Sequence, residues 1–315
     1  MAIHLRQVAL VARELAPVID DLCATFSLKR GHVDPEVGKY GLENTLIAVG
    51  ARFLEVVAPT QPGTAGGRYL DRRGGDGGYM VICQVPTLDE QAAVRARAAE
   101  AGVRVAHEID RKTWNIMQLH PADMGAAFLE VDWDEKADVA GNWMPAGGES
   151  WRDDVATDVI SDITGVELQS GDPEALATTW AAVCGLPVEH EGGMPCIRLA
   201  DALIRFAEAT DGRGPGLSAV RLRAEDAGRA LAQAKARGVL TPAGDIRQRR
   251  PPGGAGGAGR PDPQDRRAHR RGGGQRRREH LLRQDLGDPR RRLREDHGDQ
   301  RAGQPVAGPP GGAGH

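Results

Sequence analysis

Two glutamates stand in apolar segments where a carboxylate is unexpected. Glu55 lies in Arg52-Phe53-Leu54-Glu55-Val56-Val57, and Glu130 lies in Ala127-Phe128-Leu129-Glu130-Val131-Asp132. Residues two apart in a strand share a face, so each carboxylate would point to the same side as large apolar neighbours. Burial of a carboxylate costs several kcal/mol unless it meets a metal or a polar partner such as arginine. The repetition therefore indicates a duplicated module with one shared site.

The segments around the two glutamates repeat one order of elements. In the first copy we expect a strand at 4–12, a helix at 15–27 with apolar residues at helical spacing, and strands at 44–49 and 52–58. In the second copy we expect a strand at 78–83, a helix from about 88 to 101, and strands at 103–109, 113–119 and 126–131. Each copy is interpreted as β-α-β-β-β. The sequence thus predicts an α+β fold of tandem βαβββ modules.

Three phrases at the strand ends carry a resemblance to a known group of proteins. They are Leu5–Val11, Phe53–Pro59, and Leu119–Asp123 leading to Phe128-Leu129-Glu130. These phrases and the order of elements resemble the vicinal oxygen chelate superfamily, which comprises glyoxalase-like, bleomycin resistance and dioxygenase proteins. In that superfamily two modules pair around one cavity, with metal ligands on the first and last strand of each. The resemblance implies ligands at Gln7, Glu55, a residue near Met80, and Glu130.

The implied ligand set is incomplete. Gln7, Glu55 and Glu130 offer hard oxygen donors that suit a divalent metal such as Zn, Ni, Mn or Fe. Met80, which aligns with Gln7, stands where the superfamily usually has histidine. The resemblance implies a metal-dependent lyase or isomerase of the glyoxalase kind, with a dioxygenase as the lesser alternative. In such an enzyme the metal would bind two oxygens of a small substrate and stabilise an enolate, while Glu55 or Glu130 moves a proton.

The missing fourth ligand favours a second class of function. The same cavity could bind or sequester a small molecule without a metal, as in a binding or resistance protein. In that case the glutamates would pair with arginine or with donors on the ligand.

Two further features have a structural and a functional interpretation. His120 precedes Pro121 where a strand ends, which is typical of a turn, and a catalytic role is the alternative. The glycine-rich stretch 63–78 could bring Arg68, Arg72 or Arg73 to an anionic group at the mouth of the cavity, or it could be a linker with a short helix. The sequence lacks a GxxxxGK[ST] motif, which argues against a nucleotide phosphate loop.

The pattern begins again in the second half of the chain. We predict paired modules at 1–135, a linker at 136–160, and a third module with a truncated fourth at 161–240. The metal positions are empty in this half, because Thr164 or Gly165 takes the place of Gln7 and Arg205 takes the place of Glu55. This half is therefore expected to brace the first pair or to build a binding surface.

The last part of the chain, 241–315, has a different composition. It contains 17 Arg, 16 Gly, 9 Pro and 7 Ala, and its net charge is +8, whereas residues 1–240 carry a net charge of −11. This segment has too few large apolar residues for their burial to offset the entropy of ordering it. We therefore predict that it is a disordered tail. A frameshift in a GC-rich gene is the favoured explanation, because the fourth module has no ending. The alternative is a genuine extension that binds nucleic acid through phosphates.

The composition predicts a cytoplasmic protein, and the resemblance implies a small-molecule substrate or ligand. No apolar run approaches the length of a membrane span, and Glu14 and Asp20 interrupt any signal-peptide pattern. The four cysteines are scattered in apolar settings, so they are expected to act as small hydrophobic residues rather than as a disulfide or metal framework: Cys23, Cys83, Cys184 and Cys196. The sequence sets no oligomeric state.

Overall fold

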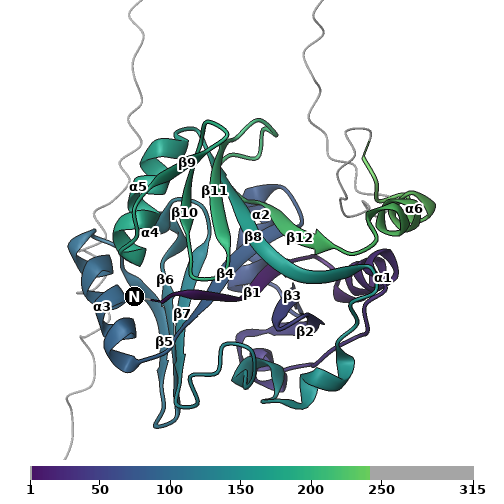
Figure 1. Cartoon of the computed structure of the whole chain (residues 1–315), viewed down its shortest axis with the longest axis horizontal. Helices are drawn as coiled ribbons and strands as arrows, with labels where there is room; N and C mark the ends of the chain where they lie inside the picture. Colours follow the sequence, from purple (N-terminus) through teal and green to yellow (C-terminus); the bar gives the residue numbers. More distant parts are fainter. Residues whose placement is uncertain (1, 242–315) are drawn as a thin grey trace, which may run out of the picture. The chain divides into compact units, whose positions relative to one another are not determined.

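The computed structural model describes residues 2–241 and contains two β-sheets (Figure 1). Apart from Thr241, the predicted disordered tail at 241–315 lies outside the described residues. Among the described residues, no helix has both the length and the apolar character needed to cross a membrane. The expected α+β fold with βαβββ modules is confirmed.

The first sheet has seven strands and contains both glutamates. In spatial order they are β2 (Leu42–Val49), β3 (Arg52–Pro59), β1 (His4–Val11), β4 (Gly77–Val85), β7 (Phe128–Asp134), β6 (Trp114–Leu119) and β5 (Val105–Asp110). At the centre, β1 pairs antiparallel with β4. On their other sides, β1 pairs in parallel with β3, and β4 pairs in parallel with β7. The two copies are therefore joined edge to edge through their first strands.

The two copies differ between the helix and the second-last strand. In the second copy, α3 (Leu88–Glu100) leads directly to β5. In the first copy, α1 (Leu15–Phe26) is followed by a single bridge between His32 and Leu46 and by the 3-10 helix η1 (Pro35–Tyr40). The side chain of Asp34 accepts a hydrogen bond from the amide of Glu36, and Pro35 has no amide hydrogen to donate to a strand partner. These two residues turn the chain where the second copy has β5.

The second sheet has five strands in the order β12 (Gly216–Ala224), β8 (Ile160–Ser170), β11 (Leu203–Glu208), β10 (Met194–Arg198) and β9 (Glu189–Glu191). Its central strand β8 pairs in parallel with β11 and antiparallel with β12, which is the arrangement of β1 with β3 and β4. Within the part of the chain that the structure describes, β12 pairs only with β8. The interpretation of 161–240 as a third module and a truncated fourth stays a prediction.

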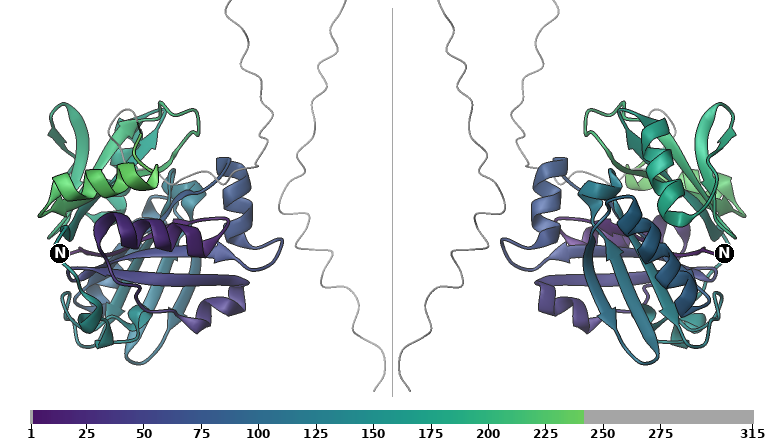
Figure 2. Two further views of the ribbon diagram at one scale, coloured as in Figure 1. Left: turned by 90° about the vertical axis from the view of Figure 1, so that its right-hand side faces the viewer. Right: turned by 90° about the vertical axis from the view of Figure 1, so that its left-hand side faces the viewer.

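One apolar core is shared by the two sheets. The first sheet contributes Val8, Leu54 and Val81, and the second contributes Val166 and Phe206. Helix α5 (Pro173–Cys184) packs against α3, and α6 (Ala227–Arg237) lies beside α1 (Figure 2). Because this core takes up one face of the first sheet, functional side chains on that sheet must lie on its other face.

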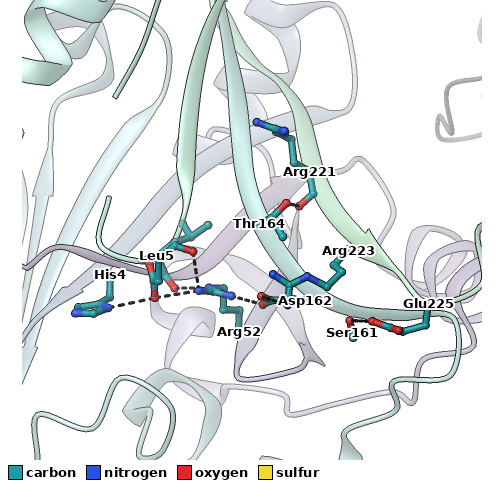
Figure 3. A network of polar contacts seen from close by, with 10 residues as sticks. His4, Leu5, Arg52, Ser161, Asp162, Thr164, Arg221, Arg223 and Glu225 are labelled. Atoms are coloured by element: carbon teal, nitrogen blue, oxygen red, sulfur yellow. Dashed lines mark hydrogen bonds and ion pairs between the residues drawn. The ribbon is translucent and has the colours of Figure 1, made fainter. Parts of the chain in front are cut away.

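Arg52 joins the two sheets in a polar network (Figure 3). Its guanidinium donates from Nε to the Leu5 carbonyl at 3.0 Å, forms an ion pair with Asp201 at 2.9 Å and contacts Asp162. The Arg52 side chain is only 11% exposed, so these carboxylates interact with it more strongly than they would in water. A second connection is formed by Arg73, whose guanidinium donates to the carbonyl of Gly214 at 2.9 Å.

Candidate functional site

The outer face of the first sheet carries all four positions that the sequence singled out. We call it the site face and define it by Gln7 on β1, Glu55 on β3, Met80 on β4 and Glu130 on β7. All four side chains are buried. The face is opposite to the shared core, because the strand residues between these positions belong to that core.

The strand registers relate the two halves of the site face. Gln7 lies beside Phe53 in the first half, and Met80 lies beside Phe128 in the second. In the same way, Glu55 lies beside Ala9, and Glu130 lies beside Ile82. Met80 therefore occupies the position in the second half that Gln7 occupies in the first.

Glu55 is held by two amide side chains. Nε2 of Gln7 donates to one carboxylate oxygen at 2.8 Å, and Nδ2 of Asn44 donates to the other at 2.6 Å. Burial raises the pKa of Glu55, although both hydrogen bonds act in the opposite direction. Glu55 is therefore a buried carboxyl group with no arginine among the partners that the structure gives it.

Glu130 is held in the second half by Gln118 on β6. Nε2 of Gln118 donates to the Glu130 carboxylate at 2.7 Å. Burial raises the pKa of Glu130 to about 7, the hydrogen bond from Gln118 opposes this shift, and the charge of Glu55 adds to it. Burial and the neighbouring Glu130 also raise the pKa of Asp132 well above its usual range. The two halves thus interact electrostatically across the site face.

A segment after β7 covers the first half of the site face. We call residues 141–151 the cap segment; the sequence assigned it to a linker. Nε1 of Trp143 donates to Oε1 of Gln7 at 2.7 Å, and the Trp143 side chain is 1% exposed. The Trp151 ring meets the Phe53 ring edge-on at a centroid distance of 5.2 Å. The cap segment therefore contacts both the polar and the aromatic residues of the face.

The buried side chain of Arg6 contacts the cap segment. Its guanidinium lies 5.0 Å from the Trp143 ring centroid and donates to the carbonyls of Gly141 and Asn142 at 3.3 and 3.4 Å. Burial lowers the pKa of Arg6 to about 10. A buried cation against an indole ring gains energy from the ring's quadrupole, which partly offsets the loss of hydration.

Aromatic residues are concentrated around the site face. The chain has five Trp, four Phe and three Tyr, and half of these twelve lie in or against this cluster: Phe53, Tyr69, Tyr79, Phe128, Trp143 and Trp151. Tyr79 meets Tyr69 and Phe128 edge-on at centroid distances of 5.0 and 5.2 Å. Binding sites for small molecules are mostly apolar and aromatic with a few converging polar groups, which is the composition of this face.

The donors on the site face do not fit a resident divalent metal. The Gln7 oxygen accepts the Trp143 indole hydrogen, and the Gln7 nitrogen faces Glu55. A metal would need the amide oxygen turned towards Glu55 and freed from Trp143, and Met80 offers only a soft thioether. No group of three or more His, Cys, Asp or Glu side chains suited to a metal occurs within residues 2–241. The ligand set of Gln7, Glu55 and Glu130 stays a prediction that these contacts do not favour.

The other residues that the sequence singled out have structural contacts. His120 is the N-cap of the short helix α4 (Pro121–Met124), where its ring nitrogen accepts from the amide of Ala122. Helix α2 (Ala65–Arg73) forms in the glycine-rich stretch, and its Arg68 and Arg73 donate to backbone carbonyls. The four thiols are free, and three of them are buried. In the second sheet, Arg205 donates to Glu191 at 3.1 Å.

Sequence reasoning missed five residues of the site face. They are Asn44, Gln84, Gln118, Asp132 and Trp143. A usable signal was present for three of them. Gln84 lies on the same face of its strand as Met80, and Asp132 lies on the same face of its strand as Glu130. Asn44 is a polar residue of β2, the strand beside the one that carries Glu55. Trp143 gave no such signal, since it lies in a polar segment without strand or helix periodicity.

Paired βαβββ modules joined through their first strands, with polar residues on one buried face, define a protein of the vicinal oxygen chelate superfamily. The match to known families makes this more specific. Residues 8–184, more than half of the chain, match the glyoxalase-like domain, and the chain belongs to that family. No curated protein sequence matches the chain.

The chain is also similar to solved structures. A variant of 4-hydroxymandelate synthase from Streptomyces coelicolor matches with a TM-score of 0.58 and 15% identity, over 76% of each chain. A variant of methylmalonyl-CoA epimerase from the same organism, in complex with 2-nitronate-propionyl-CoA, matches 42% of this chain and 99% of its own, with 18% identity and a TM-score of 0.37. The methylmalonyl-CoA epimerase of Mycobacterium tuberculosis is 24% identical over 42% of this chain and 87% of its own, with a TM-score of 0.36.

Proposed function

We propose that the chain binds a small molecule on the site face without a resident metal. The observation that carries this proposal is the aromatic cluster around buried amide and carboxyl groups, of which the cap segment covers the first half. The ligand would replace the contacts of Trp143 with Gln7 and would pack against Tyr79 and Phe128. The cap segment would then cover the bound ligand instead of the empty face.

The first test is the metal content of the purified chain by elemental analysis, before and after loading with Zn, Ni, Mn or Fe. The proposal expects less than stoichiometric metal, with no difference between the wild-type chain and the Glu55→Gln and Glu130→Gln variants. Near-stoichiometric metal that falls in both variants would overturn it and would support the metal-dependent lyase or isomerase instead.

The second test is a thermal-shift screen with small aromatic and oxygenated compounds. A ligand of the site face should raise the melting temperature of the wild-type chain and of the Arg205→Met variant, which alters only the second sheet. The shift should be lost in Gln7→Leu, because Gln7 lies on the site face. Equal shifts in all three proteins would place the binding elsewhere and contradict the proposal.

A second candidate function is a lyase or isomerase that uses its buried carboxyl groups to move a proton of the substrate. The favouring observation is the Glu130 carboxyl group, whose burial raises its pKa to about 7, in electrostatic contact with Glu55. A general acid or base works best when its pKa lies near the working pH. Glyoxalase-type substrates should then turn over with a pH profile that bends near 7 and disappears in Glu130→Gln, whereas a pure binding protein would show no turnover.

A further inference from the structure

Two neighbouring polar side chains on the site face are buried without partners. Both side-chain atoms of Gln84, Nε2 and Oε1, and both carboxylate oxygens of Asp132 lack a hydrogen bond of standard geometry, although the Glu130 carboxyl group and the Met117 backbone are near enough to act on the pKa of Asp132. Gln84 is 0% exposed and Asp132 is 3% exposed. They lie side by side because β4 and β7 pair with Gln84 opposite Asp132. Each such atom costs about 1–3 kcal/mol if it stays unpaired, so these atoms point to a ligand that would satisfy them.

The chemistry of the missing partner follows from the free atoms. In its ionised form, which an adjacent cation would favour, Asp132 offers only acceptors, and Gln84 offers one acceptor and one donor group. The adjacent Glu130 adds a second carboxyl group, and no Lys or Arg within the described residues forms an ion pair with Asp132 or Glu130. The complementary group is therefore a cation with several N–H donors. An oxygen next to that cation would accept the hydrogen bond from Gln84 Nε2.

The nearest cavity lies at the end of β7, two residues further along the strand than Asp132. A cavity of about 90 Å³ lies between the end of that strand and the cap segment, and its walls are Thr113, Asp134, Glu135, Lys136, Asn142 and Met144. Asp134 lies on the same face of β7 as Asp132, about 7 Å further along the strand. Two carboxylates in the wall outweigh Lys136, whose amino group is 3.3 Å from Glu149 outside the cavity lining. The wall of this cavity thus carries one more negative than positive charge.

We infer that Gln84 and Asp132 form a recognition site for the primary ammonium group of a small molecule with an oxygen on the neighbouring carbon. The ammonium would donate to both carboxylate oxygens of Asp132 and to Oε1 of Gln84, and the ligand oxygen would accept from Nε2 of Gln84. This inference rests on the proposed function and names the class of ligand. Burial raises the pKa of Asp132 well above its usual range, and an adjacent cation would relieve that cost.

The test is isothermal titration of the full chain with 2-amino-1-phenylethanol and, as its neutral match, 1-phenylethane-1,2-diol. The amine should bind the wild-type chain at least about tenfold more tightly than the diol. Asp132→Asn keeps the shape of the side chain and should weaken binding of the amine by about tenfold to a hundredfold. Gln84→Met should weaken it by a smaller factor, and Glu100→Gln, which removes a carboxylate from the exposed end of α3, should leave it unchanged.

Several results would overturn the inference. Equal binding of the amine by the wild-type chain and Asp132→Asn would place the ammonium elsewhere. Equal binding of the diol and the amine would leave the proposed binding function standing but would reject ammonium recognition. If neither compound binds, this inference fails, whereas the proposed function fails only if the wider screen also finds no ligand. Magnesium or calcium binding that is lost in Asp132→Asn, in place of amine binding, would identify a metal ion as the cation.

Discussion

The strands β4 and β12 hold corresponding places in their sheets but have very different surroundings. In β4, seven of nine residues are buried, whereas in β12 only the first two are. The difference lies in the flanking strands, because β4 lies between β1 and β7, while β12 has only β8 as a partner among the described residues. Burial of such a strand therefore requires the neighbouring strands of the second half: β7, β6 and β5. The residues of the strand itself are not sufficient.

Glu55 and Arg205, which hold corresponding positions in the two sheets, also differ in burial. Glu55 in the first sheet is buried and bound by amide groups, while Arg205 in the second sheet reaches the exposed Glu191. A buried carboxyl group has a shifted pKa and a high energetic cost, which can be used in binding or catalysis. A solvated ion pair contributes little to stability or to function.

The largest expected effect comes from removing the cap contact. Trp143→Ala should lower the free energy of unfolding by about 4 kcal/mol, because Trp143 is fully buried against Arg6 and Gln7 and leaves a large cavity. Trp143→Phe, which loses the indole hydrogen bond but keeps a ring, should cost only about 1 kcal/mol. Urea unfolding of both variants measures the difference. Similar small effects would mean that the cap segment does not stabilise the site face.

The next effect is a pH dependence specific to the first sheet. Because the pKa of Glu130 is raised from its ordinary 4.5 to about 7, the protonated group stabilises the folded chain. This contribution is fully present below pH 4.5 and is lost as the pH rises to about 7, which corresponds to roughly 3 kcal/mol. Unfolding measured at pH 5 and pH 8 should show this loss in the wild-type chain. The loss should be smaller in Glu130→Gln, where the raised pKa values of Glu55 and Asp132 still contribute, and an unchanged pH dependence in the variant would assign it to other groups.

A third prediction concerns the position in the second sheet that corresponds to Gln7. Gly165 has φ +156°, and a Cβ there would lie 2.0 Å from the carbonyl oxygen of Leu203. Gly165→Ala should therefore destabilise the chain by about 2 kcal/mol or more, measured by urea unfolding. The same substitution at the exposed Gly171, where a Cβ meets nothing within 4 Å, is the matched control. If Gly165→Ala does not lower the stability, a side chain that contacts a ligand could be placed at this position.

The smallest expected effect is at Arg205. Arg205→Met removes an ion pair with the exposed Glu191, so the melting temperature should stay within the error of the measurement. A clear loss of stability would show that this part of the second sheet is less open to solvent than the contacts indicate. It would also reduce the contrast with Glu55.

Much of the fold could be predicted because its signals are local. The helix Leu88–Glu100 begins after Thr87, whose side chain accepts from the amide of Glu90, and ends just before Gly102 in the left-handed region, so the predicted helix from about 88 to 101 matched within one residue. Alternation within strands also placed Glu55 and Glu130 on one face. The strands predicted at 44–49 and 52–58 are confirmed as β2 and β3, but the β-α-β-β-β order expected of the first copy requires one more strand, and Asp34 and Pro35 turn the chain where it would lie.

The partners of the site residues could not be predicted in the same way. Whether Glu55 meets a metal, an arginine or an amide depends on the register of β2, which places Leu46 opposite Glu55 and Asn44 two residues further along, and that register is set by the whole sheet. The role of Trp143 depends on a contact with Gln7 that spans 136 residues of sequence. Neither signal is contained in a short window of sequence.

The position of β1 has a consequence for the order in which the chain acquires its structure during synthesis. β1 leaves the ribosome before every other strand that the structure describes, yet it lies between β3 and β4, and the carbonyl of Ile3 accepts from the amide of Ala200. Its apolar residues must therefore wait for about 80 later residues before both edges are paired, and for some 200 before its end is fixed. Until then, the unpaired edges of this apolar strand can pair with strands of neighbouring chains. We expect the nascent chain to depend on chaperones at this stage more than its finished stability would suggest.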